Sequence, residues 1–173
     1  MIKRRKALST LAAGLGAVIS FPSWANGWSL KSLGKIQYLD IEDEVLLMSI
    51  VDTIIPATDT PGAKAVGVHI LIQKLLQDCQ PRAAQDSFRM GLVTTNAVAI
   101  GKYGNSFIDL SNEEKKEVLI SMSLSEYPDQ KNFFTSVKRM TVDGYMKSEY
   151  AMTNITKWEM APNRYYGCVQ VKA

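Results

Sequence analysis

Three side chains of this 173-residue chain are the natural candidates for acid–base chemistry. His69 is the single histidine, and it stands at the start of an apolar run, where a histidine is more often structural than catalytic. Asp52 and Asp59 lie on either side of a proline, in a stretch where acidic side chains more often cap helices and turns than form an acid pair. The sequence therefore predicts no catalytic residue.

Gly62 and Gly67 have the spacing of the two glycines in a phosphate-binding loop. Such a loop continues with a lysine and a serine or threonine, which hold the phosphates and a magnesium ion. Here the next residues are Val68 and His69, so the clamp is missing and the spacing does not predict a nucleotide site.

Cys79 and Cys168 are the two cysteines of the chain. They are too far apart in sequence for a metal-binding pair, and the chain contains no Cys-x-x-Cys-His segment for haem attachment. In an oxidising compartment they could form a disulfide that closes a long loop, and the alternative is two buried free thiols. We therefore expect no metal and no cofactor in this chain.

The net charge of +3 is misleading because it comes from the first 25 residues. These hold four of the 20 basic residues and none of the 17 acidic ones, which leaves sixteen bases against seventeen acids and a net charge of −1 for the rest. Without a basic excess, nucleic-acid binding loses its main electrostatic argument. A hydrophobic content of 46% is that of one folded domain rather than of a disordered chain or a membrane bundle.

Residues 1–25 have the pattern of an export signal: a basic start, an apolar run of about fifteen residues and a small-residue site ending at Ala25. Arg4 and Arg5, with Leu8 after them, resemble the twin-arginine signal, which carries folded proteins. An ordinary secretory leader is the alternative. Either route predicts a periplasmic protein, including one associated with the periplasmic face of the inner membrane.

A helical hairpin is predicted at the centre of the chain, after a short tether at 26–39. Asp40 caps a helix whose apolar stripe runs to Ile55, and Pro56 stops it. Residues 57–62 read as a turn, and a second apolar stripe runs from Val68 to Leu76. Two stripes joined by a short turn indicate two helices that share a core.

Three further helices are predicted, at about 82–100, after a capping box formed by Ser111 and Glu114, and at about 130–145. The last of these helices carries Phe133, Phe134, Val137, Met140 and Thr141 on one side, a helical spacing that favours core packing over a cofactor site. We thus expect an all-α protein: a single compact domain over 40–173 with about five helices and an irregular aromatic C-terminal tail.

The tail from Ser148 onward has no helical period and is rich in aromatic residues, which are costly to leave in water. It either straps its own domain or forms a surface shared with another subunit. The candidates for such an interface are Trp158, Arg164, Tyr165 and Tyr166.

Taken together, the leader, the hairpin and the tail resemble the gluconate 2-dehydrogenase subunit 3 family. The likeness covers most of residues 40–170 and departs from the family pattern at Met146-Lys147 and Tyr150. The matching segments are Arg4-Arg5, 52–56 (DTIIP), 59–63 (DTPGA), Gly67-Val68, Phe107, Leu110-Ser111, 141–145 (TVDGY), Ser148 and 162–168 (PNRYYGC).

This resemblance implies a small, non-catalytic accessory subunit that assists folding, twin-arginine export and assembly of a partner. The partner would be an FAD-bearing dehydrogenase of the glucose–methanol–choline type that oxidises a sugar or sugar acid, with a c-type cytochrome as electron acceptor. Two other hypotheses stay open. One is an independent periplasmic enzyme or small-ligand-binding protein, which predicts a deep pocket around His69, Asp52 or Arg89. The other is a structural periplasmic protein.

Overall fold

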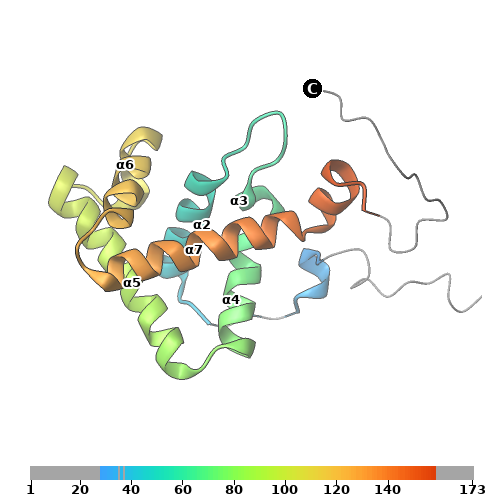
Figure 1. Cartoon of the computed structure of the whole chain (residues 1–173), viewed down its shortest axis with the longest axis horizontal. Helices are drawn as coiled ribbons and strands as arrows, with labels where there is room; N and C mark the ends of the chain where they lie inside the picture. The colour runs from blue at the N-terminus through green and yellow to red at the C-terminus, as the bar shows by residue number, and fades with distance from the viewer. Residues whose placement is uncertain (1–27, 35, 37, 159–173) are drawn as a thin grey trace, which may run out of the picture.

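All five predicted helices are present in the computed structural model, which describes residues 28–34, 36 and 38–158. Every regular element in the described residues is a helix, which confirms the all-α class (Figure 1). The α-helices are α2 (Ile41–Ile54), α3 (Ala63–Val66), α4 (Val68–Cys79), α5 (Arg82–Tyr103), α6 (Asn112–Ser123) and α7 (Pro128–Met146), and the shorter helical turns are η2 (Leu30–Ser32), η3 (Phe107–Asp109) and η4 (Ala151–Ile155).

Helix α2 begins and ends at the residues that the sequence indicates. The side chain of Asp40 accepts a hydrogen bond from the backbone N–H of Asp43 at 3.1 Å, and three acidic residues in the first turn suit the positive end of the helix dipole. The helix stops at Ile54, and Ile55 leaves helical geometry just before Pro56. The inner face of α2 supplies Leu47, Ile50 and Val51, which are all fully buried.

The second helix of the hairpin is α4, which begins at Val68 as predicted, but a short helix that was not predicted, α3, precedes it. Gly67 separates them with a backbone φ of 85°, a left-handed conformation that glycine adopts without steric cost. Its missing side chain also leaves room for Leu30 of η2, because a Cβ at Gly67 would lie 2.3 Å from the Leu30 Cδ2. The break therefore lets the segment before α2 pack against the hairpin.

Helix α5 is the longest helix described and continues past Gly101 to Gly104, where φ is 77°. We expected it to end near Ile100, so Gly104 is the residue that stops it. Further up the helix, Gly91 faces Phe133 of α7, and a Cβ at this glycine would lie 2.0 Å from the Phe133 ring. Phe133 also packs on Phe88, with ring centroids 5.2 Å apart. Gly91 thus sets how closely α5 and α7 approach each other.

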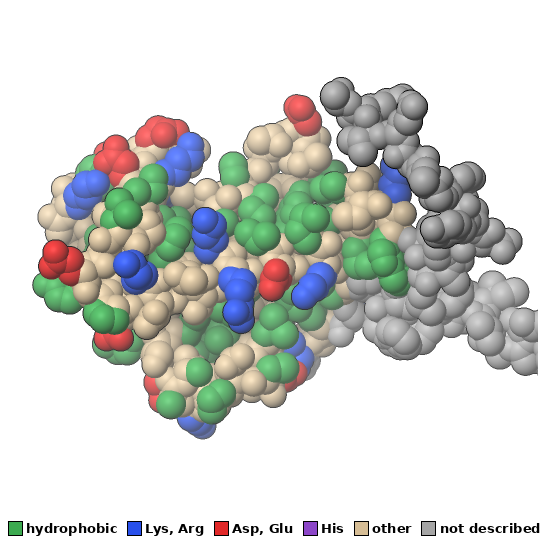
Figure 2. Space-filling model, viewed as in Figure 1, with side chains coloured by type: hydrophobic (Ala, Val, Ile, Leu, Met, Phe, Trp, Pro, Cys, Tyr) green, Lys and Arg blue, Asp and Glu red, His purple; other side chains and the backbone are tan. Residues whose placement is uncertain are grey.

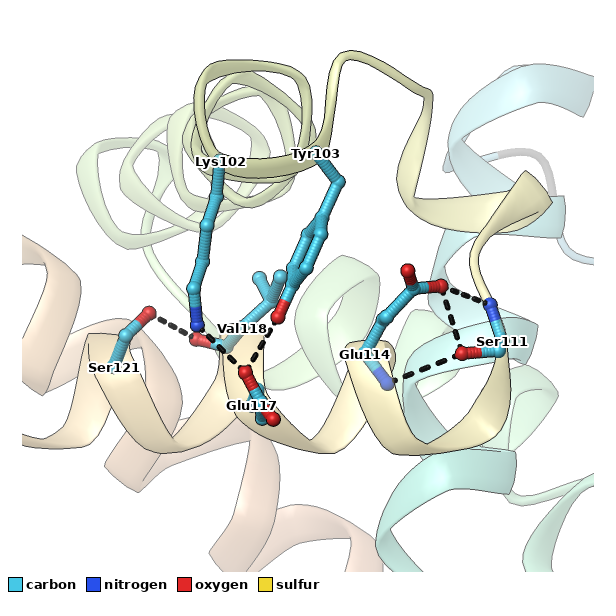
Figure 3. Close-up of polar contacts among 7 residues, drawn as sticks. All are labelled: Lys102, Tyr103, Ser111, Glu114, Glu117, Val118 and Ser121. Atoms are coloured by element: carbon cyan, nitrogen blue, oxygen red, sulfur yellow. Dashed lines mark hydrogen bonds and ion pairs between the residues drawn. The ribbon is translucent and has the colours of Figure 1, made fainter.

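Helix α6 begins with the predicted capping box (Figure 3). The backbone N–H of Ser111 donates to the Glu114 carboxylate at 2.8 Å, and the Glu114 backbone N–H donates to the Ser111 hydroxyl at 3.4 Å. Figure 3 also shows the end of α5 lying over α6, where Lys102 and Tyr103 both donate to the Glu117 carboxylate, at 2.9 and 2.6 Å. These hydrogen bonds lower the pKa of Glu117.

Helix α7 is the centre of the fold and contacts α2, α3, α4, α5 and α6 (Figure 1). Pro128 is the first residue of α7, whereas we expected it to precede the helix. A proline is well tolerated at this position because backbone N–H groups in the first turn of a helix have no partner within the helix. The buried side of α7 includes Phe133, Val137 and Thr141, as the spacing predicts. Phe134 is only half-buried, with the Lys138 ammonium 5.8 Å from its ring centre.

Two glycines of α5 provide a matched test of this packing. We predict that Gly91→Ala lowers the free energy of unfolding by about 1–3 kcal/mol, because the new methyl group would overlap the Phe133 ring. Gly101→Ala, in the same helix, has no atom within 4 Å of the new methyl group and should raise it by about 0.5–1 kcal/mol. Urea unfolding followed by circular dichroism measures both. Equal effects of the two substitutions would contradict the proposed contact between α5 and α7.

Candidate interaction surface

The end of α7 is fastened to the segment that precedes the helical hairpin. The indole N–H of Trp28 donates to the Gly144 carbonyl at 2.7 Å, across 116 residues of sequence. The Trp28 carbonyl accepts from the Glu149 N–H at 3.0 Å, and the Trp28 N–H donates to the Lys147 carbonyl at 3.3 Å. Trp28 therefore forms a short parallel bridge with Ser148, just after α7 ends.

The proline–glycine turn of the hairpin joins the same place. The Tyr145 hydroxyl donates to the Pro61 carbonyl at 2.8 Å. The Ser148 hydroxyl donates to the Tyr145 carbonyl at 2.6 Å and accepts from the Ala151 N–H at 3.2 Å, so it links α7 to η4. We call these five residues, Trp28, Pro61, Gly144, Tyr145 and Ser148, the junction. It brings together three segments that lie far apart in sequence.

Gly144 keeps the junction close to α4. A Cβ at this position would lie 3.0 Å from the Leu71 Cδ2 and 3.2 Å from the Val68 Cγ1, which is tighter than ordinary van der Waals contact. The Gly62 side of the turn is tighter still, since a Cβ there would lie 2.6 Å from the backbone nitrogen of Ala57. At both positions the surrounding atoms therefore leave little room for a side chain.

A hollow of about 620 Å³ opens beside the junction. It lies between η2, the end of α3 and the residues that follow α7, and its lining includes Leu30, Lys31, Val66, Glu149 and Tyr150. Leu30 is 48% exposed, so an apolar side chain faces solvent in the wall of this hollow. A hollow with an exposed apolar side chain in its wall is a candidate surface for receiving another molecule.

The expected tether at 26–39 is, in its described part, packed onto the domain. Tyr38 is buried, and its hydroxyl donates to the Gln85 carbonyl at 2.7 Å. The Arg89 guanidinium lies 4.8 Å from the centre of the Tyr38 ring and also donates to the Tyr38 carbonyl. Burial raises the pKa of Tyr38, with Arg89 opposing this shift. Arg89 is thus occupied in holding this segment against α5.

The other residues considered for chemistry are not brought together. His69 is buried, and in the described part of the chain its Nδ1 atom has no hydrogen-bond partner. Burial lowers the pKa of His69, while Glu44 acts in the opposite direction. Asp52 is half-buried on α2, and Asp59 is exposed in the turn. Neither the hollow beside the junction nor a second one between α5 and α7 is lined by His69, Asp52 or Arg89.

Several predicted site residues lie outside the described residues. These are Arg4, Arg5 and Leu8 of the leader and Arg164, Tyr165, Tyr166 and Cys168 of the tail. Cys79 is exposed at the end of α4, so it is not a buried thiol, and its pairing with Cys168 stays a prediction. The tail is not irregular from its start, because residues 151–155 form the π-helical turn η4.

The described residues contain neither a candidate metal site nor a candidate membrane span. Within residues 28–34, 36 and 38–158, no three His, Cys, Asp or Glu side chains are grouped as they would be to hold a metal ion. Among the helices described, none combines the length and the apolar character needed to cross a bilayer.

None of the five junction residues was predicted to belong to a site, and Trp28 and Tyr145 make the long-range contacts among them. Both donate a hydrogen bond to a backbone carbonyl far away in sequence, and no local pattern announces such a contact. The one available signal for Trp28 was a tryptophan inside a segment expected to be a solvent-exposed tether, where its exposure would be costly.

Comparison with known proteins gives one match. The family model described as gluconate 2-dehydrogenase subunit 3 matches residues 41–162, which is more than two thirds of the chain. No curated protein and no solved structure matches it. The matched range contains every α-helix described above and four of the five junction residues, with Trp28 lying before it.

The hydrogen bond of Trp28 can be tested with a conservative substitution. We predict that Trp28→Phe lowers the free energy of unfolding by about 1–2 kcal/mol, because the Gly144 carbonyl loses its donor and part of the ring contact is lost. Trp158→Phe is the control, since the Trp158 side chain is about half exposed, and it should change stability by less than about 0.5 kcal/mol. An equal loss in both variants, measured by urea unfolding, would contradict a specific role for Trp28.

His69 gives the fold a predictable dependence on pH. Because burial lowers its pKa below the usual 6.5, the unfolded chain binds a proton more readily than the folded chain. The contribution of His69 is therefore complete above pH 6.5 and is lost as the pH falls from 6.5 toward the lowered pKa. We predict that His69→Gln reduces the drop in unfolding free energy between about pH 7.5 and about pH 5.5. An identical drop in the two proteins would show that His69 is not the responsible group.

Proposed function

The chain belongs to the gluconate 2-dehydrogenase subunit 3 family, and on that premise we propose that it is the non-catalytic small subunit of an exported sugar or sugar-acid dehydrogenase. In this proposal it assists the folding, export and assembly of the catalytic subunit. The observation that carries the proposal is the family match over residues 41–162, which includes the whole helical core.

The catalytic partner in this proposal is a flavoprotein of the glucose–methanol–choline type, which carries FAD. A c-type cytochrome subunit carries haem and accepts the electrons. The small subunit itself holds no cofactor and supplies no catalytic residue. The position of His69 supports this division, because a buried imidazole that lines neither hollow is badly placed to take a proton from a substrate.

The segments that carry the family resemblance are used for packing in this chain. In the TVDGY segment, the Tyr145 hydroxyl donates a hydrogen bond to the carbonyl of Pro61 in the proline–glycine turn. The carbonyl of Gly144, in the same segment, accepts a hydrogen bond from the Trp28 indole. The Ser148 hydroxyl, in turn, donates a hydrogen bond to the Tyr145 carbonyl at the end of α7 and accepts one from the Ala151 N–H at the start of η4. These residues fix the shape of the surface beside the hollow rather than bring reactive groups into it. This supports a role in binding a partner protein.

The junction also bears on export. Trp28 comes three residues after Ala25, the expected end of the leader, and is bound to the end of the last long helix. Trp28 can therefore form these contacts only after α7 has folded. That dependence suits a twin-arginine signal, which carries folded cargo. We propose that one such signal delivers this chain and its bound partner to the periplasm.

We predict that replacing Arg4 and Arg5 together with lysine blocks export of this chain and removes dehydrogenase activity from the periplasm. The substitutions keep the charge but not the twin-arginine pattern. The matched control replaces Lys3 and Lys6 with arginine, which leaves Arg4 and Arg5 in place, and should leave export intact. Both are measured by immunoblotting and by dehydrogenase assay of periplasmic extracts. Undiminished periplasmic activity in the lysine variant would refute shared export.

A further inference from the structure

Helix α5 carries an apolar stripe on the side that faces away from its own domain. Met90, Val93 and Ile100 are 63%, 55% and 49% exposed, and Ala97 between them is exposed as well. The opposite side of the same helix is buried in the core through Phe88, Leu92, Thr95 and Ala99. A helix that is apolar on both sides is usually covered on both sides, so the exposed side of α5 lacks a cover within the described chain.

The stripe also lacks charge over an unusual length. Between Arg89 and Lys102 the helix has twelve consecutive residues without a charged side chain. The face that α7 presents is different, because lysine and arginine side chains are interspersed with hydrophobic ones along it (Figure 2). Depletion of charge is what distinguishes the buried centre of a protein interface from the rest of a surface. On this criterion α5 offers a better interface than the exposed face of α7.

The spacing of the stripe indicates the shape of what covers it. Met90, Val93, Ala97 and Ile100 follow one another at intervals of three, four and three residues. This is the spacing of the narrow seam along which two helices pack in a coiled coil. We call these four residues the α5 seam. A single helix lying along α5 would therefore cover it.

A hollow next to the seam offers a place for side chains of that helix. It has a volume of about 750 Å³ and lies between α5 and α7, with Met90 of the seam on its rim. Phe88, Phe133 and Gly91 also line it, and the two rings are almost fully buried. Charged side chains line it as well, namely those of Asp86, Asp129 and Arg139. Energetically important contacts of protein interfaces are concentrated where an anchor side chain enters a pocket of this kind. The seam and the hollow thus form one continuous surface.

We propose that the α5 seam and this hollow bind a helix of the catalytic dehydrogenase subunit, with an apolar side facing Met90, Val93 and Ile100. The proposal rests on the proposed function for the existence of that subunit. It adds the surface at which the subunit binds, on the side of the molecule away from η4 (Figure 1). Within the complex, α5 is then covered on both sides.

Two other occupants fit the seam less well. A second copy of this chain would pair α5 with α5 over only about three helical turns, or roughly 15 Å, which covers far less than the ~800 Å² per partner of a standard interface. In the tail of this chain, residues 159–173, the sequence contains Pro162 and Gly167, which both disfavour a continuous helix of that length. A large partner that also contacts the chain elsewhere has neither restriction.

The test places a charge in the seam of the full-length chain. Met90→Lys and, separately, Val93→Lys are expressed with an affinity tag in the native host, and Leu124→Lys is the matched control. Leu124 is 76% exposed and lies at the end of α6, outside the seam. The readout is the flavin absorbance that co-purifies with each mole of tagged chain, with the flavoprotein identified by peptide mass. Circular dichroism confirms that each variant has the helix content of the wild type.

We expect each seam variant to lose at least tenfold of the co-purifying flavin, because a buried unpaired charge strongly opposes binding, and Leu124→Lys to retain it. Full retention in both seam variants would overturn the seam proposal and leave the proposed function intact. If no flavoprotein co-purifies with the tagged wild-type chain, the proposed function is wrong, and the seam proposal is wrong with it. Sedimentation of the isolated wild-type chain as a dimer, with Met90→Lys a monomer, would also overturn the proposal by assigning the seam to a second copy.

Discussion

The fold depends on the burial of α7 by the helices around it. Glycines permit close approach near both ends of this helix: Gly91 of α5 leaves room for Phe133 near its start, and Gly144, close to its end, leaves room for Leu71 and Val68 of α4. Because both contacts leave almost no free space, α7 has little freedom to shift between α4 and α5. The positions of the junction, the two hollows and the α5 seam all follow from this placement.

The arrangement separates two surfaces with different character. The junction gathers the segment before α2, the proline–glycine turn and the residues after α7, and the exposed Leu30 side chain lines the hollow beside it. The α5 seam is built from one helix, is free of charge and adjoins a hollow lined by two aromatic rings and by the charged side chains of Asp86, Asp129 and Arg139. A subunit that holds a larger partner benefits from two such surfaces, because a partner bound at both dissociates far more slowly than one bound at either.

Local patterns predicted the helices well because their signals are local. Asp40 and the Ser111–Glu114 box set helix starts through hydrogen bonds within one turn, and Pro56 follows the helix end for an equally local reason. The short helix α3 and the left-handed conformation of Gly67 after it were not predicted, because the contact that leaves no room for a side chain at Gly67 is with Leu30, almost forty residues earlier. The same limit applies to the segment around Tyr38, whose partners Gln85 and Arg89 lie some fifty residues away.

The candidate site was predictable only in part, for a related reason. The sequence predicted an interface at Trp158, Arg164, Tyr165 and Tyr166; Trp158 is about half exposed, and the other three lie outside the described residues. The helical turn η4 was missed because it is short and its residues, Ala151 to Ile155, have no apolar period. The outer stripe of α5 was missed because the periodicity of Phe88, Leu92 and Ala99 already explained that helix as a core element. Apolar residues on a second side of a helix indicate an interaction surface only when the structure shows that this side is exposed to solvent.

The central claim is that this chain contributes surface and not chemistry to a dehydrogenase. The most direct measurement is native mass spectrometry of the complex purified from the periplasm, followed by release of the individual subunits in the gas phase. The account predicts that this chain leaves with the mass of its polypeptide alone, and that FAD stays with the large subunit. Flavin, haem or metal retained on this chain would contradict the account.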